Sequence, residues 1–135
     1  MARAFEETLP DLLIRDLPLP EPLRVPKGAS IRETIEAMQS RRRPCVLVCD
    51  GRKVVGIFTE RDILRALSQD FDAPGQPVAH WMTRDPVRVD VGVSVQQALD
   101  LMLSKGFRHL PVEEGGEVVG MVSMRDLSQA IAEPD

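Results

Sequence analysis

The sequence has few of the residues that disulfide frameworks, metal sites and nucleic-acid surfaces require. Only two cysteines occur, Cys45 and Cys49, and positions four apart in a strand lie about 13 Å from each other, too far for a disulfide. Two thiols are also too few for a zinc site, so we expect both to be buried and free. The 17 basic and 21 acidic residues give a net charge of −4, which disfavours nucleic acid and anionic membranes as partners.

Long apolar runs and catalytic signatures are missing as well. No stretch has transmembrane length, and the first residues lack the basic-then-apolar pattern of a signal peptide, so we expect a cytoplasmic protein with no membrane partner. The two histidines, His80 and His109, stand in no nucleophile motif, and neither GxxxxGK[ST] nor GxGxxG occurs. The sequence therefore favours a binding protein over an enzyme.

What the chain does contain is an internal repeat. Residues 22–67 align without a gap with residues 86–131, which lie 64 positions later. Of the 46 paired positions 15 are identical, and they include polar residues such as Asp62 and Asp126 that a shared core alone would not preserve. A repeat of this kind predicts two copies of one supersecondary unit that stabilise each other.

Each repeat predicts the element order β-α-β-β-α. In the first repeat, Ser30-x-x-Glu33 is a capping box that begins a helix, and Asp50-Gly51 joins two apolar strands as a hairpin. Thr59 then caps a second helix. The second repeat copies this order, with helices that begin after Ser94 and Ser123. We accordingly divide the chain into an extended N-terminal arm (1–21), a first motif (22–67), a linker (68–80) and a second motif (81–132), with a helical turn near 77–82.

Both repeats carry the pattern G-h-x-[ST]-x-x-D at the junction between a strand and a helix, from Gly56 to Asp62 and from Gly120 to Asp126. With these motifs the chain resembles a tandem pair of cystathionine-β-synthase (CBS) domains. The segment 81–87 resembles the family's M-T-x-x-P-V entry, and the segment 108–112 resembles its R-H-L-P-V strand. The resemblance implies a stand-alone α/β protein in which two β-α-β-β-α motifs pack through their sheets with pseudo-twofold symmetry.

The residues of the repeated pattern have the chemical properties of a nucleotide-binding site. A glycine lets a ligand or a neighbouring backbone approach the strand closely, and the first amides of a helix favour an anion such as phosphate near Thr59 and Ser123. The carboxylates of Asp62 and Asp126 accept hydrogen bonds, and a ribose diol offers two adjacent donors. The alternative is ordinary helix capping, because a Thr or Ser cap followed by Asp in the first turn also stabilises a helix.

The resemblance places further residues around such a ligand. Arg61, Arg125 and His109 are expected near phosphate, and Asp62 and Asp126 are expected to bind ribose. Solvated arginines and a half-buried histidine are the alternative. Cys45 stands where the second repeat has His109, which weakens the phosphate side of the first repeat. Adenine is expected to lie against apolar strand residues, namely Val46, Val48, Leu110 and Val112.

The resemblance also implies ligands and partners. Pairs of this family bind AMP, ADP, ATP or S-adenosylmethionine, form homodimers through their helices, and regulate an effector protein. The apolar helix residues that would form the dimer contact, unless they complete the internal core, are Leu64, Leu67, Leu127 and Ile131. The alternative function is a structural dimerisation or interaction module that binds no nucleotide.

Overall fold

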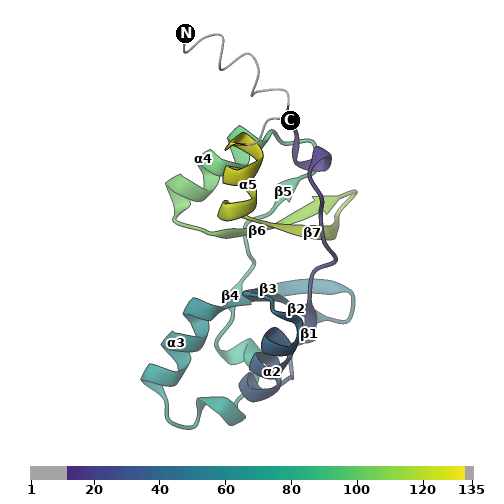
Figure 1. The fold of residues 1–135 in the computed structure, drawn as a ribbon. Helices are drawn as coiled ribbons and strands as arrows, with labels where there is room; N and C mark the ends of the chain where they lie inside the picture. Colours follow the sequence, from purple (N-terminus) through teal and green to yellow (C-terminus); the bar gives the residue numbers. More distant parts are fainter. Residues whose placement is uncertain (1–11, 133–135) are drawn as a thin grey trace. The chain divides into compact units, whose positions relative to one another are not determined.

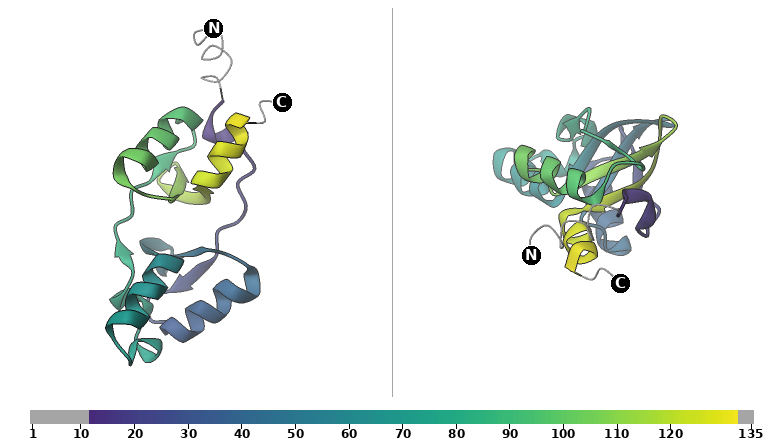
Figure 2. Two further views of the ribbon diagram at one scale, coloured as in Figure 1. Left: turned by 60° about the vertical axis from the view of Figure 1, so that its left-hand side comes forward. Right: turned by 90° about the horizontal axis from the view of Figure 1, so that it is seen from above.

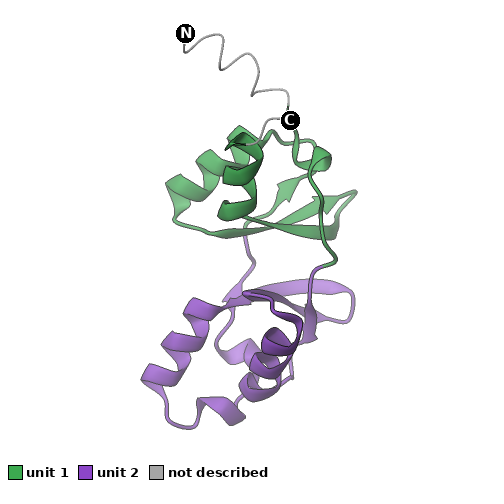
Figure 3. Cartoon of the chain, in the orientation of Figure 1, with its two compact units in different colours: residues 1–21, 87–135 green, residues 22–86 purple. Residues whose placement is uncertain are grey.

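The computed structural model describes residues 12–132, which form two compact units (Figures 1 and 3). Unit 2 comprises residues 22–86 and holds the first repeat, whereas the described part of unit 1 comprises residues 12–21 together with 87–132 and holds the second. None of the helices in the described range has the length and apolar character that crossing a bilayer requires.

Unit 2 has a four-stranded sheet of order β1-β2-β3-β4, in which β1 is parallel to β2 and the other pairs are antiparallel. Its elements in chain order are β1 (Arg24–Pro26), α2 (Ile31–Arg41), β2 (Cys45–Asp50), β3 (Lys53–Thr59), α3 (Glu60–Gln69), the 3-10 helices η2 (Ala73–Gly75) and η3 (Val78–His80), and β4 (Thr83–Arg84).

Unit 1 repeats this order with a three-stranded sheet, β5-β6-β7. Its elements are η1 (Ile14–Asp16), β5 (Val89–Asp90), α4 (Val95–Lys105), β6 (His109–Glu114), β7 (Glu117–Ser123) and α5 (Met124–Ala132). The predicted α/β fold of two β-α-β-β-α motifs is therefore confirmed.

The predicted local signals form as expected. Ser30 and Ser94 each accept the backbone N–H three residues on, at 3.0 Å, and Glu33 and Gln97 bond back to them as capping boxes. Gly51 adopts a φ of 62° in the first hairpin turn, which few residues other than glycine tolerate. Both hairpins also carry a register shift at equivalent positions, after Val48 and after Val112.

In each unit the helices cover one face of the sheet and enclose a core of their own (Figure 2). The core of unit 2 includes Phe58 and Ile31, and that of unit 1 includes Leu110 and Met102, all essentially without exposure. Leu127 is fully buried in the core of unit 1, and Ile131 packs against that core. Leu64 and Leu67 are instead 72% and 47% exposed.

The segment that precedes each motif packs on the other motif. The Ile14 N–H donates to Val93 O at 2.9 Å, and the Val78 N–H donates to Ala29 O at 2.7 Å. The two bonds are equivalent, because Ile14 lies 64 positions before Val78 and Ala29 lies 64 positions before Val93. The helices η1 and η3 are also 64 positions apart. The repeat therefore extends upstream to residue 12. Residues 12–21, which the sequence suggested as an extended arm, thus contribute Ile14, with no exposure, to the core of unit 1.

The strand glycines that both repeats share, Gly56 and Gly120, make room for these preceding segments. A Cβ on Gly56 would collide with the Met82 side chain and come within 2.9 Å of the Thr83 carbonyl oxygen. A Cβ on Gly120 would lie 3.0 Å from the Leu19 Cβ. The glycines of the G-h-x-[ST]-x-x-D pattern therefore have a packing role in this structure.

Candidate functional site

The junction between β3 and α3 in unit 2 is closed by a reciprocal capping box. The Thr59 backbone N–H donates to Asp62 Oδ2 at 2.9 Å, and the Thr59 hydroxyl donates to the same oxygen at 3.2 Å. The Asp62 N–H lies 3.4 Å from Thr59 Oγ1. The helix-capping alternative thus describes what these two side chains do in the structure.

A side chain outside the predicted set also engages Asp62. Arg65 lies one turn further along α3, and its Nη2 is 3.4 Å from Asp62 Oδ1 and 2.6 Å from the Trp81 carbonyl oxygen. The guanidinium carbon also lies 5.5 Å from the centroid of the Trp81 ring, a cation–π distance. Asp62 is consequently buried, with an exposure of 7%.

Trp81 is itself fixed by a short polar chain. Its Nε1 donates to Gln76 Oε1 at 2.7 Å, and Gln76 Nε2 donates to Asp70 Oδ2 at 2.8 Å. The Asp72 backbone N–H, with Gln76, holds the pKa of Asp70 below its ordinary value, so this acceptor stays ionised. This series of hydrogen bonds links the loop after α3 to Trp81, and Trp81 in turn positions Arg65.

The junction between β7 and α5 in unit 1 has the same capping box, and residues 12–132 supply no third partner to it. The Ser123 N–H donates to Asp126 Oδ2 at 3.2 Å, and the Asp126 N–H donates to Ser123 Oγ at 3.0 Å. Asp126 is exposed, and within residues 12–132 no cation forms an ion pair with it. The position that matches Arg65 is Gln129, which is also exposed.

The predicted phosphate residues lie near these junctions. Arg61 and Arg125 follow the caps in the first helical turns, are exposed, and form no ion pair in the described part of the chain. His109 begins β6, is half-buried, and pairs across the sheet with Ser123. Cys45 takes the equivalent place opposite Thr59, and burial raises the pKa of its thiol to about 12. That thiol is neutral near pH 7.

The structure does not bring the predicted adenine residues to the surface. Their side chains lie in the helix-side cores with exposures of 0–1%, namely Val46, Val48, Leu110 and Val112. Because strand side chains alternate, the opposite sheet faces carry the cross-strand pairs Leu47 with Ile57 and Pro111 with Met121. Apolar runs of consecutive residues hid this alternation in the sequence.

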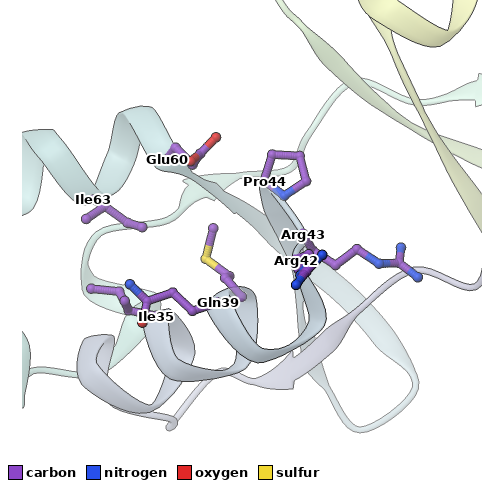
Figure 4. Close-up of a pocket in the computed structure, with 8 residues that line it drawn as sticks. Ile35, Gln39, Arg42, Arg43, Pro44, Glu60 and Ile63 are labelled. Carbon is purple, nitrogen blue, oxygen red and sulfur yellow. The ribbon is translucent and has the colours of Figure 1, made fainter.

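Unit 2 also has a pocket of about 340 Å³ on its helical side, between α2 and the start of α3 (Figure 4). Its charged lining consists of Arg42, Arg43 and Glu60, and its apolar lining includes Ile35 and Ile63. None of the predicted ligand-binding residues lines it. The second repeat has Gly106, Phe107 and Met124 at the three charged positions, and Phe107 and Met124 pack against the core of unit 1.

Sequence reasoning missed Arg65, Gln76 and Trp81 as determinants of the first junction. The spacing from Asp62 to Arg65 was a usable signal, because residues three apart on a helix are neighbours. The contact with Trp81 had no comparable signal, since 16 residues separate the pair. Within residues 12–132 no three His, Cys, Asp or Glu side chains gather as a metal site would require.

Comparisons with known proteins identify the family. The model of the CBS domain family matches residues 14–69 and 78–133. The chain is 41% identical over 110 residues to a 17.7 kDa protein of Acidianus ambivalens, a match that spans 79% of this chain and 65% of that protein's length.

Solved structures agree with this match. The CBS-domain containing protein ATU1752 from Agrobacterium tumefaciens is 31% identical, with a TM-score of 0.82 over 87% of this chain and 98% of that one. The CBS domain protein PAE2072 from Pyrobaculum aerophilum, solved with AMP, is 27% identical with a TM-score of 0.79, over 90% and 98% of the two chains. Since two family matches cover both repeats, this chain belongs to the CBS domain family as a tandem pair.

Proposed function

We propose that this chain is a regulatory module that binds an adenine nucleotide, with AMP as the first candidate, and passes its occupancy to a partner protein. The observation that carries the proposal is the open junction in unit 1. There an exposed Asp126 carboxylate, oriented by the Ser123 cap, has an oxygen, Oδ1, without a hydrogen bond in the described chain. Such an oxygen is a suitable acceptor for a ribose hydroxyl.

Phosphate recognition is assigned to the same end of unit 1. His109 pairs across the sheet with Ser123, and Arg125 directly precedes Asp126 in the first turn of α5. A guanidinium can bind phosphate oxygens through two parallel hydrogen bonds. Adenine would then lie beside Met121, which is half-buried on the opposite face of the sheet, since Leu110 and Val112 are occupied in the core.

The choice of AMP rests on similarity, because PAE2072 was solved with AMP and shares the fold of this chain. ADP, ATP and S-adenosylmethionine remain in the test set, because they carry the same adenosine group. Regulation follows if the ligand binds two states of the module with different affinity, since a ligand shifts an equilibrium only by that difference.

Thermal unfolding tests the proposal. We expect AMP at about 100 times its dissociation constant to stabilise the protein by about 2.7 kcal/mol, a shift of several degrees, whereas GMP does not. Asp126→Ala should weaken AMP binding about ten-fold or more, because a hydrogen bond to a charged group is lost. If no adenine compound shifts the transition at millimolar concentration, the nucleotide proposal is wrong and the module acts through protein contacts alone.

A further inference from the structure

We propose that Arg65 blocks the first junction, so that the chain binds one adenine nucleotide, through Asp126, although both repeats carry the aspartate. This inference rests on the proposed function, because it concerns the number of nucleotide sites and the residue that sets it. Arg65 acts as a specificity-determining residue in this scheme and does not itself contact the nucleotide.

The two carboxylates differ in what remains free for a ligand. Asp62 Oδ2 accepts two hydrogen bonds from Thr59, and Asp62 Oδ1 faces Arg65, so both oxygens have protein partners. Only 10% of its side chain is exposed. Asp126 uses Oδ2 for the Ser123 cap and leaves Oδ1 without a hydrogen bond in the described range. A ribose diol needs an accessible acceptor, which only the second junction provides.

The position of Arg65 is fixed by more than the ion pair. Its bond to the Trp81 carbonyl oxygen is short, at 2.6 Å, and its guanidinium carbon lies over the Trp81 ring, 5.5 Å from the ring centroid. Trp81 is held in turn through its bond to Gln76. A side chain held in this way loses little further entropy when it pairs with Asp62, so a sugar hydroxyl must displace a preorganised partner.

The second repeat lacks every part of this arrangement. Residues 64 positions away from Arg65 and Trp81 are Gln129 and Leu17, which bring neither a cation nor an aromatic ring. The residues expected near phosphate also favour the second junction. The second repeat has His109 at the position where the first has the buried Cys45. Two separate substitutions therefore favour the second junction over the first.

Equilibrium titration of the full chain with AMP, read by calorimetry, tests the proposal. We expect one AMP per chain in the wild type, a loss of about ten-fold or more in affinity for Asp126→Ala, and no change for Asp62→Ala. Arg65→Gln copies the residue of the second repeat and should admit a second AMP per chain. Asp62→Ala in the Arg65→Gln background should remove that second AMP again.

A reciprocal variant in unit 1 tests the same idea without any substitution in unit 2, where Arg65→Gln could disturb folding. Gln129→Arg places a guanidinium one turn from Asp126 and should weaken AMP binding about two- to five-fold, the range expected from an exposed ion pair. Arg52→Gln is the matched control for Arg65→Gln, because it removes the same charge from an exposed side chain in the first hairpin turn and should leave the number of bound AMP molecules unchanged. Circular dichroism establishes that each variant is folded.

The outcomes separate the two proposals. Two AMP molecules per wild-type chain, or a single AMP that is lost in Asp62→Ala, would overturn the role of Arg65 while leaving nucleotide binding intact. A folded Arg65→Gln variant that still binds one AMP would overturn it as well. If neither the wild type nor Arg65→Gln binds AMP, the proposed function itself fails.

Discussion

The junctions of the two units share a helix cap and differ in everything that surrounds it. In unit 2 the Asp62 carboxylate is capped, paired with Arg65 and buried, whereas in unit 1 the equivalent Asp126 is capped and exposed. The G-h-x-[ST]-x-x-D pattern is therefore compatible with two different environments. The pattern secures the strand-to-helix turn, and residues outside it decide whether the carboxylate is buried or exposed.

The helix layers differ in a related way. In unit 1, α4 and α5 pack directly, with Phe107 and Met124 among the residues against the core. In unit 2 the equivalent positions are Arg43 and Glu60, and a pocket remains between α2 and α3. Apolar side chains close the space in one unit, and charged side chains that keep their hydration leave it open in the other.

The largest expected difference between the units lies in their cores. Phe58 has no exposure, and its counterpart in the second repeat is the smaller Val122, with 2% exposure. Phe58→Ala should lower the free energy of unfolding by about 3–5 kcal/mol, because it removes a buried ring and leaves a cavity. Val122→Ala should cost about 2 kcal/mol, since only two methyl groups are lost. Urea unfolding measures both, and equal losses would contradict the comparison.

The strand glycines should differ by a smaller amount. Gly56→Ala should cost about 2–3 kcal/mol, because the new Cβ meets the Thr83 carbonyl oxygen at 2.9 Å as well as Met82. Gly120→Ala should cost about 1 kcal/mol, because its nearest neighbour is Leu19 at 3.0 Å. Gly28→Ala is the control, as no atom lies within 4 Å of a Cβ there. A greater loss for Gly120→Ala than for Gly56→Ala would overturn this ranking.

Arg65 should contribute modestly to stability as well as to selectivity. Arg65→Gln removes the ion pair with Asp62 and the bond to the Trp81 carbonyl oxygen, and should cost about 1 kcal/mol. Gln129→Ala should change the free energy of unfolding by less than about 0.5 kcal/mol, as expected for an exposed site. If the two variants lose the same stability, the network around Trp81 does not hold Arg65 as we describe.

The smallest expected effect concerns the thiol that replaces histidine in the first repeat. The pKa of Cys45 rises from 9.0 to about 12 on burial, so the unfolded chain loses this proton first as the pH increases. The neutral, buried thiol therefore stabilises the folded state fully below pH 9, and this stabilisation is lost between pH 9 and 12. From pH 8.5 to 9.5 the wild type should lose about 0.7 kcal/mol more than Cys45→Ala. Identical pH profiles for the two proteins would show that the thiol ionises freely in the folded state.

Much of the fold could be predicted from the sequence because its signals are local. The capping boxes at Ser30 and Ser94 and the turn at Gly51 depend on residues at most three positions apart. The 64-residue repeat then fixed the order of the elements in both halves. For the candidate site, the same local reasoning placed Thr59 and Asp62, and Ser123 and Asp126, together at two junctions, where the structure also brings them together.

The tertiary structure decided the features that depend on distant residues. It packed residues 12–21 on the second motif and placed Val46 and Val48 beneath the helices of unit 2. It also brought Trp81 to Arg65 across 16 residues of chain, and so made two equivalent aspartates different. The sequence by itself determined which side chains begin and cap each element, because those interactions are local. Which carboxylate stays open depends on packing between elements, because burial is a property of the folded chain.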